Sequence, residues 1–196
     1  PTVNAGADQT ECAGTAVTLT ASGAATYTWN NGVTDGTPFT PAATTTYTVT
    51  GTSAAGCVNT DQVTVTVNPI PNVFAGNDIS ICDGQTVTLS GSGAATYTWD
   101  NGATNGVAFT PAVGTTTYTV TGTSAAGCIN TDQVIVVVNP IPVVAFTPDV
   151  TQGCAPLTVN FTNTTPNVSN CVWTMSDGSV INGCGTVTNT FTTPGC

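Results

Sequence analysis

The sequence contains no lysine, no arginine and no histidine, and its ten acidic residues give a formal net charge of −10. Nucleic acids and anionic membrane surfaces are bound mainly through basic side chains, so we expect neither as a partner. A metal centre built on histidine is excluded. Catalysis that needs a histidine base, a lysine Schiff base or an arginine clamp is excluded as well.

Long apolar runs are also missing. No stretch of 18 apolar residues could span a membrane as a helix, and the N-terminus lacks the pattern of a secretory signal peptide. Glu11 is the sole glutamate, and no insertion that could form a cleft is visible, so paired carboxylates for glycoside hydrolysis are not expected. The sequence therefore predicts a protein that is not an enzyme and holds no cofactor.

Threonine is the most frequent residue, and valine, glycine and alanine are also abundant, a composition typical of β-sheets with frequent turns. The chain repeats itself, since residues 3–71 return at 73–142 with a register of 70 that becomes 71 after Ala112. A repeated domain favours length and multivalency over a unique active site.

Two short proline-containing segments, Asn68–Pro71 and Asn139–Pro142, separate the chain into three parts. Proline fixes φ and removes a hydrogen-bond donor, so these segments read as short, semi-rigid linkers. Pro1 aligns with Pro71, from which we expect further repeats upstream. The predicted domains are residues 1–69 (repeat 1), residues 70–140 (repeat 2) and a third domain of residues 141–196.

Each repeat reads as six or seven short strands with turns between them. Residues 16–20, 26–29, 45–53 and 62–67 alternate apolar and polar positions, and the Asn31-Gly32 pair is a strong turn signal. This pattern predicts an all-β fold of tandem Ig-like β-sandwiches. A 70-residue sandwich has a thin core, so cross-links are expected to stabilise it. We expect repeats 1 and 2 to superpose and to run as an extended rod.

The eight cysteines indicate disulfides and an oxidising compartment, because they occur in even numbers at repeated positions and lack the short spacing of zinc ligands. From their equivalent positions in the two copies, we expect the pairs Cys12–Cys57 and Cys82–Cys128. The third domain allows three pairings. The favoured one is Cys171–Cys184, which flank the Asp177-Gly178 turn, and it leaves Cys154 and Cys196 to each other or to absent partners.

Other candidate sites have a plainer interpretation. Trp29, Trp99 and Trp173 could stack on sugars, but their places on alternating strands favour core packing. Calcium could bind where Asp residues recur near the repeat ends, although turn and cap roles suit aspartate well. The recurring acids are Asp8, Asp61, Asp78 and Asp132, and three N-glycosylation sequons begin at Asn160, Asn163 and Asn167.

The ordered set of motifs in repeats 1 and 2 resembles a known family. It consists of Ala-Gly-x-Asp-x-x-x-Cys, Val-Thr-Leu, Tyr-Thr-Trp, Thr-Thr-Tyr-Thr-Val-Thr-Gly and Gly-Cys, followed by alternating valines. These motifs are similar to the Ig-like repeats of secreted and cell-surface proteins of Bacteroidota-type bacteria, which occur in arrays beside gliding-motility-type sorting domains. The resemblance covers residues 3–67 and 73–138 and implies an extracellular location.

Residues 143–196 resemble a PKD domain, another Ig-like sandwich. Gly153–Asn163 matches its opening strands, Trp173–Gly178 stands at its Trp-Asp-Phe-Gly-Asp-Gly motif, and Asn189–Gly195 stands at its His-Thr-Tyr segment. That family continues with further strands that are missing after Cys196. The resemblance therefore implies an incomplete third sandwich, in which side chains such as Phe161 and Trp173 lack part of their cover.

The sequence favours an extracellular structural and adhesive repeat protein, the rod-like stalk of a bacterial surface adhesin. One alternative is a subunit of an extracellular filament assembled by strand exchange through the third domain. Another is a spacer or carbohydrate-binding module of a large secreted hydrolase. The expected partners are neighbouring copies or domains of the same protein, and surface glycans or proteins.

Overall fold

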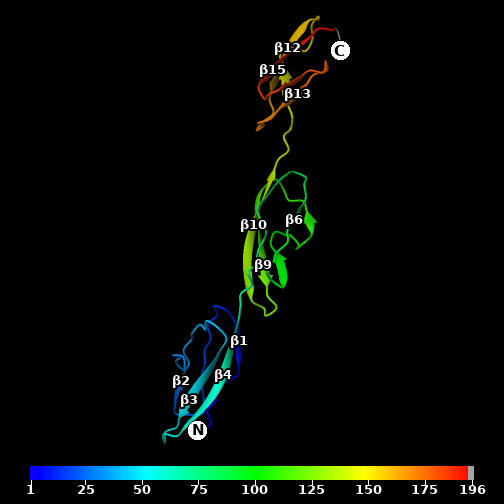
Figure 1. Ribbon diagram of the computed structural model, residues 1–196. Coiled ribbons are helices and arrows are strands. Elements are labelled where there is room, and N and C mark those ends of the chain that lie inside the picture. The colour runs from blue at the N-terminus through cyan, green and yellow to red at the C-terminus, as the bar shows by residue number, and fades with distance from the viewer. Residues whose placement is uncertain (194–196) are drawn as a thin grey trace. The chain divides into compact units, whose positions relative to one another are not determined.

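The computed structural model describes residues 1–193, and all the regular elements in that range are β-strands (Figure 1). The chain divides into two compact units, Pro1–Val137 and a C-terminal unit that begins at Val138. Each repeat within the first unit forms its own four-stranded sheet. The all-β class expected from the sequence is confirmed, and no described residue belongs to a helix of the length and hydropathy that a membrane span needs.

Repeat 1 contains one sheet with the strand order β1-β4-β3-β2. Its first strand runs parallel to its last, with Gln9 opposite Val65, while β3 pairs antiparallel with both β4 and β2. The opposite layer is reduced to two isolated bridges, Asn4↔Ser22 and Val17↔Phe39. This is an Ig-like sandwich with one long sheet and one minimal sheet. The strands are β1 (Gln9–Cys12), β2 (Thr26–Trp29), β3 (Thr45–Thr52) and β4 (Val58–Asn68).

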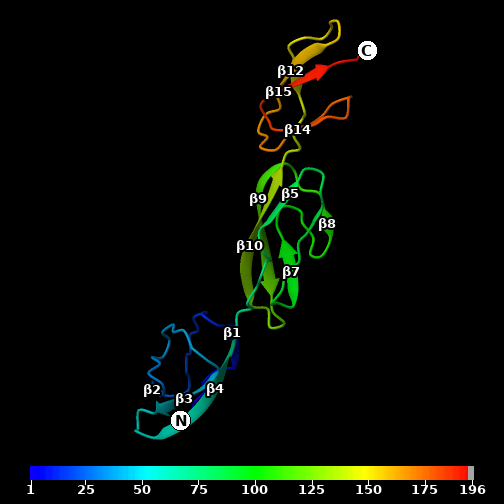
Figure 2. The same ribbon diagram turned by 45° about the horizontal axis from the view of Figure 1, so that its top comes forward.

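Repeat 2 has the same architecture, with the strand order β5-β10-β9-β7. Its second layer is better formed than that of repeat 1, because β6 and β8 pair as regular strands. Figures 1 and 2 show these two strands apart from the larger sheet. A bridge between Phe74 and Ser92 repeats the Asn4–Ser22 bridge. The strands are β5 (Ile79–Cys82), β6 (Val87–Thr88), β7 (Thr96–Trp99), β8 (Ala108–Phe109), β9 (Gly114–Thr123) and β10 (Ile129–Asn139).

The core of each repeat consists of alternate residues of the long strands. Val49, Val63 and Val65 are fully buried in repeat 1, and Val120, Val134 and Val136 take the same places in repeat 2. Aromatic rings close the core, with Phe39 and Tyr47 packed edge to face at 5.1 Å between centroids. Period-two alternation therefore placed these side chains correctly from the sequence.

The C-terminal unit has a much thinner core. Besides Val138 at its start, its buried hydrophobic side chains in the described range are Val159 and Val187, whereas Val143 and Val144 are about four-fifths exposed. A cluster of rings, formed by Phe146, Phe161, Trp173 and Phe191, fills the space between its two small sheets. The sheets are β11-β12-β15 and β13-β14. Their strands are β11 (Phe146–Pro148), β12 (Leu157–Asn163), β13 (Val172–Thr174), β14 (Val180–Asn182) and β15 (Thr186–Phe191).

Candidate functional site: a disulfide between consecutive repeats

A disulfide joins repeat 1 to repeat 2. It links Cys12, the last residue of β1, to Cys128, which immediately precedes β10, with 5.6 Å between the two Cα atoms. The two cysteines are 116 residues apart in the sequence. The connection therefore crosses the Asn68–Pro71 linker and ties the end of one repeat to the beginning of the next.

This pairing corrects the expected pairs Cys12–Cys57 and Cys82–Cys128. Cys12 lies opposite Asn68, the last residue of β4, whereas Cys57 precedes Val58, the first residue of that strand. Eleven residues of extended strand separate the two ends of β4, which amounts to roughly 35 Å at about 3.3 Å per residue. A disulfide requires Cα atoms about 4.4–6.8 Å apart, so the two cysteines of one repeat cannot meet.

Contacts with the linker surround the bond. Asn68 O accepts a 2.8 Å hydrogen bond from the backbone N–H of Ala13, and the same oxygen lies 3.9 Å from Cys128 Sγ. Asn130 Nδ2 donates to Pro71 O at 3.0 Å. The linker carbonyls at both ends are thus held by groups from both repeats. Consistent with this, Pro71 is buried and Cys128 is only 1% exposed.

The turn that presents Cys128 is identical in repeat 1, where it presents Cys57. Cys128 N donates to Ser124 Oγ at 3.1 Å, and Cys57 N donates to Ser53 Oγ at the same distance. Gly127 and Gly56 precede the cysteines with φ of +84° and +79°. The turn geometry therefore does not depend on whether the cysteine is bonded.

The turn that follows Cys12 also recurs in repeat 2, where it follows Cys82. Thr15 N donates to Cys12 O at 3.0 Å, and Gln85 N donates to Cys82 O at 3.2 Å. Cys57 and Cys82 are nevertheless free and exposed. The two repeats thus carry two pairs of equivalent cysteines. Cys12 and Cys128, which meet at the junction, are bonded to each other, whereas Cys57 and Cys82 present thiols to solvent.

The C-terminal unit contains its own disulfide, Cys171–Cys184, the pairing favoured by the sequence, with 4.9 Å between Cα atoms. It joins the residue before β13 to the residue two places before β15, and Asn163 Nδ2 donates to Cys184 O at 3.2 Å beside it. Cys154 is free and exposed. Cys196 lies outside the described residues, and so do the strands that the PKD resemblance would place after Pro194.

The recurring aspartates hold the backbone. Asp61 Oδ2 accepts from Ala5 N and Asp132 Oδ2 from Ala75 N, both at 2.8 Å. Asp8 Oδ1 accepts from Thr64 N at 2.7 Å, and Asp78 Oδ1 accepts from Ile135 N at 2.9 Å. These hydrogen bonds connect the segment just before the first strand of each repeat to its last strand, and no group of three or more metal-ligating side chains occurs in residues 1–193.

Two of these carboxyls have lowered pKa values. The backbone N–H of Ala5 is the main cause for Asp61, and the backbone N–H of Ala75 is the main cause for Asp132. Each N–H stabilises the charged form of the acid that it contacts. The carboxylates therefore act as clamps between distant segments of each repeat, which differs from the turn and cap roles that the sequence favoured.

The tryptophans pack inward rather than outward. Trp29 is 5% exposed, Trp99 and Trp173 are partly buried, and the indole N–H of each has an acceptor. The acceptors are Asp35 Oδ1, Asn105 Oδ1 and Gly183 O, at 2.8, 3.0 and 2.9 Å. Flat sugar-stacking platforms require exposed rings, so the geometry agrees with core packing.

The three sequons differ in accessibility. Asn160 Nδ2 donates to Asp149 Oδ2 at 2.8 Å, and Asn163 Nδ2 donates to Cys184 O, so the atoms that would carry a glycan are already hydrogen-bonded. Asn167 is exposed in a turn with φ of +59°. Glycosylation stays a prediction, and the structure favours Asn167 as its site.

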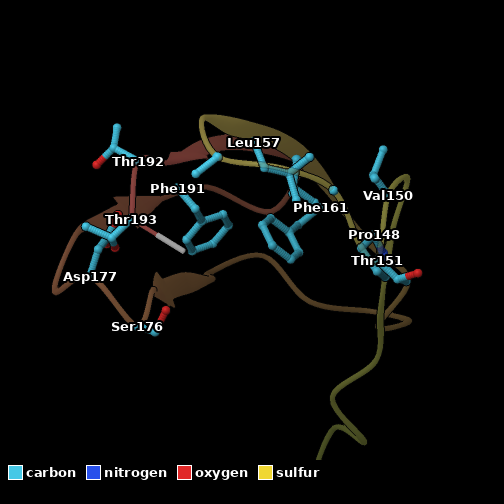
Figure 3. A pocket seen from close by; sticks show the side chains of 13 residues that line it. Pro148, Val150, Thr151, Leu157, Phe161, Ser176, Asp177, Phe191, Thr192 and Thr193 are labelled. Atoms are coloured by element: carbon cyan, nitrogen blue, oxygen red, sulfur yellow. The ribbon is translucent and has the colours of Figure 1, made fainter. Parts of the chain in front are cut away.

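The C-terminal unit also has an open groove of about 520 Å³. Figure 3 shows the rings of Phe161 and Phe191 side by side in it, on the side of the groove opposite Ser176 and Asp177. Leu157 and Val150 also line the groove. Polar and apolar side chains both line this groove, and no cluster of catalytic groups occurs among its lining residues.

Neither a protein-family model nor a curated protein sequence matches the chain. Solved structures of tandem Ig domains are similar at low identity. The eight N-terminal Ig domains of Down Syndrome Cell Adhesion Molecule are 17% identical, with a TM-score of 0.48 over 96% of this chain and 37% of that one. The chain thus spans about a third of the length of that structure.

Two further structures are similar over shorter or weaker matches. The insect immune protein hemolin is 17% identical, with a TM-score of 0.39 over 69% of this chain and 46% of that one. The titin fragment I67–I69 is 13% identical, with a TM-score of 0.36 over 87% of this chain and 82% of that one. The Ig-like description of the repeats rests on their own strand order and register.

Proposed function

We propose that the protein is an extracellular structural and adhesive repeat protein, in which Ig-like repeats form the rod-like stalk of a bacterial surface adhesin. The observation that carries this proposal is the Cys12–Cys128 disulfide. It provides a second covalent connection between two domains that a four-residue linker already joins. A second covalent link of this kind is expected in a protein whose role depends on a fixed distance between its domains.

The mechanical reason is simple. Two bodies joined at one point can swing and twist about it, whereas bodies joined at two points can only hinge about the line through both. Pro69 and Pro71 restrict the linker further, because proline fixes φ. Asn68 and Pro71 also have their carbonyl groups held by neighbouring groups. The junction therefore limits the relative rotation of the repeats.

Composition supports the same proposal. Two disulfides fit an oxidising extracellular compartment. A net charge of −10 without a single basic residue makes chains repel one another and keeps a long surface structure in solution. Weak contacts made by successive repeats with surface glycans or proteins would add through avidity.

The test is small-angle scattering of the full chain. The native protein should give a narrow distribution of long interatomic distances, and Cys12→Ser/Cys128→Ser should broaden it because the junction then swings. The matched control is Cys171→Ser/Cys184→Ser, which removes a disulfide that crosses no repeat junction. A compact globule for the native chain, or equal broadening by both variants, would contradict a stalk.

A second candidate is a filament subunit assembled by strand exchange, and the groove beside Phe161 and Phe191 favours it. An apolar strand from a second copy could cover these rings by adding to the sheet. Such an assembly needs no disulfide. Sedimentation of the full chain at rising concentration in a reducing buffer should then show oligomers, and a monomer at every concentration would rule out strand exchange.

A further inference from the structure

Two cysteines of the C-terminal unit follow from the same end of one pair of strands. β12 and β15 run antiparallel, and Leu157, the first residue of β12, lies opposite Phe191, the last residue of β15. Cys154 comes three residues before Leu157, and Cys196 comes five residues after Phe191 in the sequence. The segments that carry the two cysteines therefore start from neighbouring points at one end of the sheet.

The lengths of these two segments are sufficient for a disulfide. Opposite Cα atoms of an antiparallel pair lie about 4.5–5.5 Å apart. At about 3.3 Å per residue, Cys154 can lie up to about 10 Å and Cys196 up to about 17 Å from that pair. A disulfide needs Cα atoms about 4.4–6.8 Å apart, which both segments allow. This geometry depends on the ladder and on two short chain lengths, and not on how exposed Cys154 is.

The groove of the C-terminal unit brings the two segments to one place. Gly153 and Ala155, the two neighbours of Cys154, line this groove. Thr192 and Thr193, the residues that follow β15, line it as well. The chain on both sides of Cys154 and the chain that leads towards the last cysteine thus border the same cavity.

We propose that Cys154 and Cys196 form a disulfide within the same chain. Cys154 has no disulfide partner among residues 1–193. The other two cysteines of the unit, Cys171 and Cys184, are already bonded to each other. The pair Pro194-Gly195, which is typical of turns, immediately precedes Cys196 and allows the chain to change direction there.

The two disulfides of the unit then fasten opposite ends of one ladder. Asn163, the last residue of β12, donates from Nδ2 to Cys184 O at 3.2 Å and to Cys171 Sγ at 3.4 Å, so the first bond lies at that end. The second bond lies beyond Leu157, at the other end of β12. A unit with few buried side chains gains stability from both, because each cross-link restricts the unfolded chain.

The oxidant is a small-molecule disulfide such as oxidised glutathione. One of the two protein thiolates attacks it, which forms a mixed disulfide and releases one glutathione thiolate. The other protein thiolate attacks the protein sulfur of the mixed disulfide and releases the second glutathione. The two protein thiols lose two electrons and two protons in total, and one oxidised glutathione becomes two molecules of the reduced thiol.

Peptide mapping of the unmutated full chain tests the pairing. Protein kept in an oxidised-glutathione buffer is alkylated under denaturing conditions without reduction and then digested. The four cysteines of the unit fall on four different peptides, because chymotrypsin cleaves after Phe146, Phe161, Trp173 and Phe191. The peptide with Cys154 should be linked to the peptide that begins at Thr192, in protein that migrates as a monomer on non-reducing gels. Alkylated Cys154, or Cys154 linked to another cysteine or to a second chain, overturns the proposal.

Serine variants of the full chain provide a second measurement. If the two cysteines share one bond, Cys154→Ser and Cys196→Ser each remove it, and the double variant loses nothing more. Each variant should speed amide hydrogen exchange in β12 and β15 by at least about tenfold and leave β3 and β4 unchanged. Additive effects in the double variant, or unchanged exchange in Cys154→Ser, would contradict a shared bond. The result does not depend on the stalk, because a spacer or a filament subunit could contain the same bond.

Discussion

The indole Nε1–H of Trp29 donates a 2.8 Å hydrogen bond to Oδ1 of Asp35, and the same oxygen accepts the backbone N–H of Ala21. In repeat 2, Asn105 Oδ1 accepts from Trp99 and from Gly91 in the same way. An amide and a carboxylate thus serve equally in one structural role. The shared requirement is an acceptor oxygen rather than a negative charge.

Replacing Asp35 by alanine should therefore destabilise repeat 1, since it leaves two partly buried donors without an acceptor. The expected loss is about 1–3 kcal/mol in the free energy of unfolding. Asp35→Asn restores the arrangement of repeat 2 and should cost less than half as much. Urea titration monitored by tryptophan fluorescence measures the free energy of unfolding of both variants. Equal losses for the two variants would mean that the negative charge of Asp35 is required.

Gly23 should tolerate no side chain. A Cβ at this position would overlap the backbone carbonyl oxygen of Thr2, and φ is +92°. Gly36 has φ of +72° with nothing within 4 Å of a Cβ, so it is the matched control for backbone strain alone. Gly23→Ala should lower the melting temperature clearly more than Gly36→Ala does. Similar shifts would show that the N-terminal segment around Thr2 moves away at little cost.

The pattern of thiol reactivity should follow the bonded pairs. Under native, non-reducing conditions, a maleimide should label Cys57 and Cys82 and leave Cys12 and Cys128 unmodified. Loss of the inter-repeat bond should destabilise the chain, by up to about 5 kcal/mol in the chain-entropy model of a loop this long. Labelled Cys12 in protein that was never reduced would contradict the cross-junction pairing.

Acid should weaken the C-terminal unit through Asp177. The Ser179 hydroxyl, followed by the Asn189 amide and the Ser179 backbone N–H, lowers its pKa from 3.8 to about 2. Because the folded value lies below the unfolded one, this contribution is fully present above pH ~3.8 and disappears as the pH falls towards 2. Asp177→Asn should flatten this loss in urea titrations. With no histidine, stability should change little between pH 5 and 7.

Much of the fold could be predicted from local patterns. The alternating pattern predicts the strand Thr26–Trp29 with the same first and last residues that the structure shows. It also predicts which valines of β3 and β4 face the core. The strand expected at residues 16–20 is reduced in repeat 1 to the single bridge between Val17 and Phe39. Val17 and Leu19 are buried as the alternation predicts, but the sequence pattern alone does not show whether the backbone finds a neighbouring strand to pair with.

The disulfide pairs of repeats 1 and 2 could not be predicted from repetition, because equivalent cysteines in two copies are compatible with bonds within each repeat and with a bond between the repeats. The decisive fact is which end of the sandwich each cysteine occupies. The long polar-apolar run after Cys57 contains a hint, since an uninterrupted eleven-residue strand carries the chain away from that cysteine. Cys171 and Cys184 were easier because only 13 residues and one hairpin separate them.

The Cys12–Cys128 bond also changes the route by which tension travels along the chain. A pull on the two ends passes from Cys12 through the sulfur atoms to Cys128, so the backbone between them carries no force even if its strands unfold. At about 3.5 Å per extended residue, a separation of 116 residues corresponds to roughly 400 Å of hidden length. Reduction of one bond would release that length, which makes the redox state of the surroundings the control of how far the molecule can stretch.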